Sequence, residues 1–121
     1  MSKGHAVYVS ITGLRVKRRR DGLRFAWHAF LSMRQAKRAQ GNLQAEVKTI
    51  DGVHHTLTVW ESEAHMRRFL YRGAHRAAIG AFPDIATGKT FGFETDRVPD
   101  WDAVHALWHE HGREYTAPLK D

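Results

Sequence analysis

The stretch Val53-His-His-Thr-Leu-Thr-Val-Trp-Glu-Ser-Glu-Ala-His-Met-Arg-Arg-Phe-Leu70 decides the fold, because its apolar spacing changes from that of a strand to that of a helix. Leu57 and Val59 alternate with polar residues, which is the period of a strand with one buried face. After Ser62, Met66 and Phe69 recur at helical spacing. The stretch therefore predicts a strand over 55–60 that leads directly into a helix.

Histidines in this stretch raise the question of a metal site. His54 and His55 are neighbours on the predicted strand, so their side chains point to opposite faces and at most one of them faces any cavity. His65 falls on the predicted helix, away from its apolar face. His105 and His109 share a face of a later helix, but no third ligand accompanies them. The sequence thus favours no metal site.

Upstream of this stretch, the pattern predicts a strand over 6–16, a helix over 22–40 and a strand over 43–50. Asp21 is placed to cap the helix, and Asp51-Gly52 is a strong signal for a tight hairpin turn between the second and third strands. The helix carries an apolar arc that we expect to face the core, made of Leu23, Ala26, Trp27, Phe30 and Met33.

Downstream, the first helical segment is expected to end at Gly73, and a second segment over 74–82 is expected to stop at Pro83. A last strand over 89–94 and a C-terminal helix over 100–111, closed by Gly112, follow. This order is the split βαββαβ pattern of ferredoxin-like folds. We therefore predict one α+β domain over 1–121, with a ferredoxin-like core over 5–95 and a C-terminal helical extension over 96–121.

Composition excludes several classes of function. The chain has 121 residues, a net charge of +6 and no cysteine, so disulfides, thiolate nucleophiles and cysteine-based zinc sites are excluded. The absence of a signal-peptide pattern and of a long apolar run predicts a cytoplasmic protein without a membrane span. Much of the positive charge comes from the basic run over 17–20, and we expect this run to form a solvated loop. Nucleic-acid binding is less favoured, because no aromatic residues interleave with this run.

Several motifs resemble the dimeric α/β-barrel superfamily, above all the antibiotic-biosynthesis monooxygenases and related proteins. They are a strand ending in Trp60-Glu, the helical Met66 and Phe69, the Gly73-Ala-His75 that opens a second helix, and Arg34-Gln35 before Gly41. The resemblance covers residues 5–95 and is strongest over 56–79. It implies a four-stranded antiparallel sheet with helices on one face, and a homodimer whose two sheets pack face to face.

The residues expected on the sheet face opposite the helices give a separate reason to expect the dimer. Tyr8, Thr56, Thr58 and Trp60 are uncharged, which a second sheet covering them would explain. The alternative is a monomer with a threonine-rich face in water, as antiparallel sheets often have.

The resemblance also implies a substrate pocket between the helices and the sheet. His75 is the expected catalytic base, because a neutral imidazole can accept a phenolic proton, and Arg34 is expected to hold the resulting enolate or a carboxylate. The alternatives are a backbone-bonded histidine at a helix start and an arginine with its head in solvent. The residues expected to bind substrate, each of which could instead belong to the core, are Trp27, Phe69, Ile79, Phe91 and Phe93.

Cofactor use divides the family that the chain resembles. Some members oxygenate aromatic polyketides with oxygen alone, whereas others bind or degrade haem. This chain has Ile79 where haem-degrading relatives carry their ligand histidine and Phe69 where they favour tryptophan, although His75 is left as an alternative iron ligand. We therefore expect no cofactor. The chain is predicted to oxygenate or bind a small aromatic or apolar molecule; the alternative is a non-catalytic barrel that binds a ligand or partner.

Overall fold

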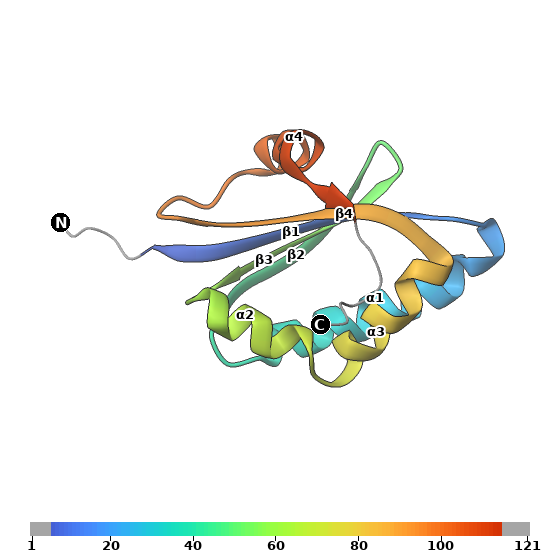
Figure 1. Cartoon of the computed structure of the whole chain (residues 1–121), viewed down its shortest axis with the longest axis horizontal. Coiled ribbons are helices and arrows are strands. Elements are labelled where there is room, and N and C mark those ends of the chain that lie inside the picture. The colour runs from blue at the N-terminus through green and yellow to red at the C-terminus, as the bar shows by residue number, and fades with distance from the viewer. Residues whose placement is uncertain (1–5, 115–121) are drawn as a thin grey trace.

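The structure, a computed structural model, describes residues 6–114, and at Ala74, His75, Pro83 and Glu114 it describes the backbone alone. Figure 1 shows one sheet between two helical layers, with α1, α2 and α3 on one face and α4 on the other. The elements are β1 (Val7–Val16), a short 3-10 turn (Arg19–Asp21), α1 (Gly22–Arg38), β2 (Asn42–Ile50), β3 (Val53–Trp60), α2 (Glu63–Leu70), α3 (Gly73–Ile85), β4 (Ala86–Thr95), α4 (Trp101–His111) and β5 (Arg113–Glu114).

The sheet has the strand order β2-β3-β1-β4-β5, and each described pair is antiparallel. The predicted α+β, ferredoxin-like βαββαβ fold with a C-terminal helix is confirmed. A fifth strand was not predicted: β5 adds to the edge of the sheet through the pairs Lys89–Glu114 and Thr90–Arg113. None of the helices in the described range is long and apolar enough to cross a bilayer.

Local signals placed the hairpin turn and the starts of α2 and α4 correctly, whereas the expected cap at Asp21 is wrong, because its side chain makes no capping hydrogen bond to α1 and pairs with Arg18 instead. Asp51 and Gly52 have φ angles of 52° and 77°, the left-handed pair that a two-residue hairpin turn requires. The Ser62 hydroxyl accepts the backbone N–H of His65 at 3.3 Å at the start of α2. Asp100 accepts the N–H of Ala103 at 3.0 Å at the start of α4. These contacts satisfy backbone donors that have no partner within the helix.

The expected stop of α3 at Pro83 is wrong, because the helix continues to Ile85. Its last turn buries Phe82 and Ile85 in a cluster with Leu14 of β1 and Phe25 of α1. A proline removes one hydrogen bond from a helix, and this packing holds the last turn in place. Gly73 begins α3, whereas α2 already ends at Leu70.

The expectation that the apolar arc of α1 faces the core is met only in part, because Ala26, Phe30 and Met33 line the space between α1 and the sheet but no member of the arc is buried. Leu23, Trp27 and Phe30 are 87%, 60% and 57% exposed. The buried residues of α1 are instead Phe25, Ser32 and Ala36, which also recur at helical spacing. Two of these buried residues, Ser32 and Ala36, are small. The side of the helix with the most large apolar side chains is therefore not the side that it buries.

The polar and apolar faces of the sheet are exchanged relative to the expectation: the polar face lies under α1–α3, and the apolar face lies under α4. Val9, Ile11, Leu57 and Val59 pack against Val104 and Trp108 of α4. The face with Tyr8, Thr56 and Thr58 lies beneath α1–α3, so the expectation that a second sheet covers these residues is wrong. Trp60 likewise packs against helical residues, in a cluster with Ala36, Met66 and Phe69. The physical reason is that α4 supplies the cover that the apolar face needs.

Candidate functional site

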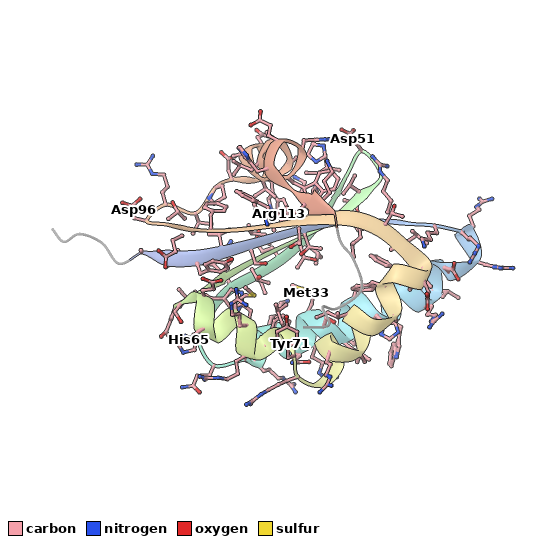
Figure 2. The ribbon with its side chains drawn as sticks, in the orientation of Figure 1. Met33, Asp51, His65, Tyr71, Asp96 and Arg113 are labelled. Carbon is pink, nitrogen blue, oxygen red and sulfur yellow. The ribbon has the colours of Figure 1, made fainter. Side chains whose placement is uncertain are left out.

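A large cavity lies between the sheet and the helical layer α1–α3. Its volume is about 1360 Å³, above the usual range for pockets that hold small molecules. Two apolar clusters bound it along β1: one contains Leu14 and Phe25, and the other contains Trp60 and Phe69. Met33 of α1 lies between the helix and the sheet, where it lines the cavity (Figure 2). The cavity therefore has an apolar wall at each end of the sheet.

The floor of the cavity, between these clusters, is a patch of hydroxyl groups. Ser10 pairs with Thr58, and Thr12 pairs with Thr56, so the four side chains are adjacent on β1 and β3. Their hydroxyls make no hydrogen bond to any residue that the structure describes. By contrast, Thr90 on β4 donates to the carbonyl of Ile11 at 3.3 Å. Four polar groups are therefore available to a ligand on the floor.

On the helical side, Ser32 adds an unpartnered hydroxyl. Its side chain is only 6% exposed and lines the cavity, and its Oγ atom has no hydrogen-bond partner among the described residues. Buried polar groups are nearly always bonded to protein, water or ligand, and leaving one unsatisfied costs about 1–3 kcal/mol. Ser32 thus marks a position where a bound molecule would supply the missing partner.

His54 is the histidine of β3 that faces this cavity. Its Nδ1 atom lies 2.9 Å from the Thr49 hydroxyl on β2, and its ring centroid lies 5.1 Å from that of Phe25. Its Nε2 atom has no partner among the described residues. The ring is therefore held by one nitrogen while the other remains available for proton transfer.

His55 packs on the opposite side of the sheet, under α4. Its Nδ1 atom lies 3.3 Å from the carbonyl oxygen of Thr12, and its Nε2 atom lies 2.7 Å from Nδ1 of His105. Burial lowers the pKa of His55 from its usual value of 6.5, partly opposed by the hydrogen bond to Thr12. The prediction that the two adjacent histidines face opposite ways is confirmed. No group of three metal-binding side chains is found among the described residues.

Tyr8 supplies a neutral phenol to the cavity wall. Burial raises its pKa above the usual 10.0, and the negative charge of Glu63 adds to this rise. The hydroxyl therefore stays protonated near neutral pH and can donate a hydrogen bond. Gly92 on β4 leaves room for it, because a Cβ atom at that position would collide with the Tyr8 hydroxyl.

The predicted substrate-binding residues fall in different places. Phe69 and Ile79 line the cavity, and Phe91 also borders it, although Phe91 pairs with Ile11 and packs on the α4 side of the sheet. Trp27 does not, because it lies on the exposed side of α1. Phe93 belongs to the α4 side of the sheet, where its ring lies 5.1 Å from that of Phe91.

Neither of the two predicted catalytic residues, Arg34 and His75, is among the described residues that line this cavity. Arg34 lines a second, separate groove between α1 and α2. His75 lies on α3, but its side chain is outside the described part of the chain. The predicted set omitted polar residues of the cavity that include Tyr8, Ser10, Thr12, Ser32, His54, Thr56 and Thr58, and it also omitted charged residues at the lining such as Lys37, Lys48 and Glu63. The alternation of serine and threonine on β1 and β3 is the sequence signal for this polar floor, although for Thr56 and Thr58 it also fitted a dimer interface.

Comparisons with known proteins identify the class of fold. A protein assigned as an antibiotic biosynthesis monooxygenase from Nitrosomonas europaea is 13% identical, covers 81% of this chain and 95% of its own, and superposes with a TM-score of 0.66. SnoaB, a cofactor-independent oxygenase from Streptomyces nogalater, is 14% identical, with coverages of 78% and 98% and a TM-score of 0.63. A conserved protein from Bacteroides thetaiotaomicron, described as a possible oxidoreductase, is 12% identical, with coverages of 76% and 99% and a TM-score of 0.64.

The chain therefore has the fold of antibiotic-biosynthesis-monooxygenase-like proteins, as the sequence resemblance implied. No family model and no curated protein sequence matches it. At such low sequence identities, the similarity to these structures shows the fold alone. The chemistry must be argued from the residues of the site.

Proposed function

We propose that the chain binds a small aromatic molecule with oxygen substituents in the cavity beneath α1–α3, and that it oxygenates this molecule with O₂. The observation that carries the proposal is the cavity of about 1360 Å³, which has apolar walls and unpartnered hydroxyls on two opposite sides. The apolar clusters suit an aromatic ring, whereas the hydroxyls of Ser10, Thr58 and Ser32 suit its oxygen substituents.

The proposed reaction begins with removal of a phenolic or enolic proton from the substrate. His54 can accept this proton at Nε2 while Thr49 holds its other nitrogen. His75 remains a second candidate for the base, as the resemblance implies. The neutral Tyr8 hydroxyl can then donate a hydrogen bond to the oxyanion, which is favoured by the low polarity of its surroundings.

The electron balance of the step needs no external reductant. The electron-rich anion transfers electrons to O₂, and a CH₂ carbon of the substrate becomes a carbonyl carbon. One oxygen atom is incorporated and the other leaves as water, so the substrate itself supplies all four electrons. SnoaB, which shares this fold, is a cofactor-independent oxygenase, and this likeness supports the proposal.

Haem is not part of this proposal. Ile79 lines the cavity one turn beyond His75 in α3, at the place where haem-degrading relatives carry a ligand histidine. Adding haem to the purified protein tests this point directly. We expect no shifted Soret band, and a stoichiometric one would contradict the proposal.

A homodimer also remains a proposal, and the structure limits how it can form. While α4 covers Val9, Ile11, Leu57 and Val59, a second sheet cannot pack directly on these residues. Edge strand β2 exposes Leu43 and Val47, which are 53% and 61% accessible. We expect sedimentation velocity to give the mass of a dimer that is weakened by Leu43→Glu. A monomer at all concentrations would contradict this expectation.

The test of the main proposal combines binding with oxygen consumption. A hydroxylated anthrone has an aromatic body, a phenolic proton and an oxidisable CH₂ group. We expect it to bind the chain and to be oxidised with consumption of one O₂ per molecule. His54→Gln should lower the rate at least about tenfold with little change in binding, whereas His109→Gln, an exposed histidine on α4, should leave both unchanged.

The outcomes separate the two candidate functions. Binding without oxygen consumption would favour the non-catalytic ligand-binding alternative. Failure to bind any hydroxylated aromatic probe would contradict both. If His54→Gln oxidises the anthrone at the parent rate, His54 is not the base, and His75→Gln becomes the deciding variant.

A further inference from the structure

A second concave site lies on the outer side of the helical layer, between the C-terminal half of α1 and the end of α2. This groove has a volume of about 530 Å³. Four arginines line it: Arg34 and Arg38 from α1, and Arg68 and Arg72 from α2 and the residues that follow it. No aspartate or glutamate is among the residues that form it. The groove therefore collects positive charge from two helices without any compensating carboxylate.

Two of the described arginines outside the groove have acidic partners. Arg18 lies 3.4 Å from a carboxylate oxygen of Asp21, and Arg67 lies 2.9 Å from one of Glu63. The four arginines of the groove make no ion pair with any described residue. All four are exposed, so an anion from solution can reach them. Arg34 and Arg38 also repel each other, because residues four apart are neighbours on a helix.

Helix ends do not neutralise this charge. The C-terminal ends of α1 and α2 each carry a partial charge of about −0.5, so together they offset about one of the four guanidinium charges. Arginine is always protonated at physiological pH. About three positive charges are left, which a single carboxylate does not balance. A phosphate ester carries nearly two negative charges and a polyphosphate more, and their oxygens match the fork of the guanidinium group.

The frame of the groove is held by hydrogen bonds that do not use the arginine head groups. The Gln35 side-chain amide donates to the carbonyl of Arg72 at 2.9 Å and approaches that of Phe69 at 3.4 Å, which ties α1 to the start of α3. Gly73 lies beside the Gln35 side chain with φ +52°, where a Cβ atom would be strained. The backbone that positions the arginines is therefore fixed before a ligand arrives.

His65 completes one wall of the groove and lies on α2 (Figure 2). Its Nδ1 atom lies 2.7 Å from the Ser62 hydroxyl, which also accepts the His65 backbone N–H. The Ser62 hydroxyl can donate its own hydrogen to Nδ1, and the ring hydrogen then sits on Nε2 as a further donor. The ring lies against Gly41, where a Cβ atom would collide with it.

From these observations we infer that the groove is a binding site for the phosphate or polyphosphate group of a soluble small molecule. The inference does not depend on the cavity being catalytic, because the groove and the cavity share only Phe69 among their described lining residues. It places Arg34 in an anion-binding site, although not in the cavity where the sequence resemblance put it.

Calorimetric titration with inorganic pyrophosphate at low ionic strength tests the inference. We expect the parent chain to bind it, and the double variant Arg34→Gln/Arg68→Gln to bind at least about tenfold more weakly. The matched control is Arg20→Gln/Arg24→Gln, which removes the same charge from exposed residues outside both sites. The control should stay within about threefold of the parent.

Three results would overturn the inference. They are no binding by the parent chain, equal weakening in the two double variants, and binding only to vesicles of phosphatidylcholine and phosphatidic acid but not to pyrophosphate. The second result would mean attraction to net charge alone, and the third would mean a lipid headgroup. Thermal unfolding without anion gives an independent check that the groove variant is folded. It should be at least as stable as the parent, since repulsion among the arginines is relieved.

Discussion

Nε2 of His55 on β3 lies 2.7 Å from Nδ1 of His105 on α4, so a partly buried hydrogen bond between two imidazoles joins the sheet to its outer helix. The carbonyl of Thr12 can only accept, so Nδ1 of His55 donates to it and Nε2 accepts from His105. On its far side, His105 Nε2 lies 3.5 Å from a carboxylate oxygen of Asp51 in the hairpin turn. Figure 2 shows Asp51 at the level of α4, above the sheet.

This bond predicts that His55 contributes strongly to stability. His55→Ala should lower the free energy of unfolding by about 2–4 kcal/mol, because it leaves a cavity and removes the partners of Thr12 and His105. His109 lies at an exposed position on α4, the helix that carries His105. His109→Ala should therefore change the free energy of unfolding by less than about 0.5 kcal/mol. Urea unfolding followed by tryptophan fluorescence measures both. Equal effects would mean that the imidazole pair does not hold α4 to the sheet.

Stability should also depend on pH through His55. Its folded pKa is lowered below the usual 6.5, so the unfolded chain binds the proton more readily. The contribution of neutral His55 is therefore complete above pH 6.5 and is lost as the pH falls towards the lowered pKa. We expect the urea midpoint to fall between pH 7 and pH 5.5, and to fall less in His55→Gln. A parallel fall in both proteins would assign the effect to other groups.

Substitutions on the two sides of α1 should differ sharply. Phe25→Ala should cost about 3–5 kcal/mol, because the ring is 7% exposed and packs with Phe82. Trp27→Ser should cost less than about 0.5 kcal/mol, since Trp27 is 60% exposed. Chemical unfolding of both variants checks the orientation of the helix. A large loss from Trp27→Ser would mean that the hydrophobic arc is covered in solution, for example by a second copy.

Ser32 and Thr90 give a matched pair of hydroxyl deletions. Ser32→Ala should raise the free energy of unfolding by up to about 1 kcal/mol without ligand, because it removes a buried hydroxyl that has no described partner. Thr90→Val should lower it, since the Thr90 hydroxyl donates to Ile11. With a hydroxylated anthrone bound, the advantage of Ser32→Ala should shrink or reverse. An advantage that is unchanged by ligand would mean that Ser32 does not contact it.

Local signals were enough for the order and limits of most elements. Asp51-Gly52 predicted its turn because the required backbone angles belong to that dipeptide, and Asp100 predicted the start of α4 through a contact within one helical turn. The faces were harder to predict. Periodicity separates the two sides of a strand or helix but does not say which neighbour covers each side. Once α4 covers the aliphatic face, Tyr8 and the threonines are left under the other helices.

The site was less predictable than the fold for a related reason. A cavity is a space left between elements, and its walls depend on packing between residues distant in sequence, such as Ala36 of α1 and Trp60 of β3. The grouping of Arg34 with Arg68 depends likewise on two helices that are distant in sequence. No short motif encodes either arrangement, so the sequence could not show that Arg34 lines the groove and not the cavity.

Phe69 is 7% exposed and forms part of both the hydroxyl-floored cavity and the arginine groove. The Phe69 ring therefore lies between the two compartments and contacts both of them. Any tilt of that ring made to admit a guest in one compartment changes the shape of the other. If a guest in one compartment does tilt the ring, linkage requires that occupancy of each compartment changes the affinity of the other by the same factor.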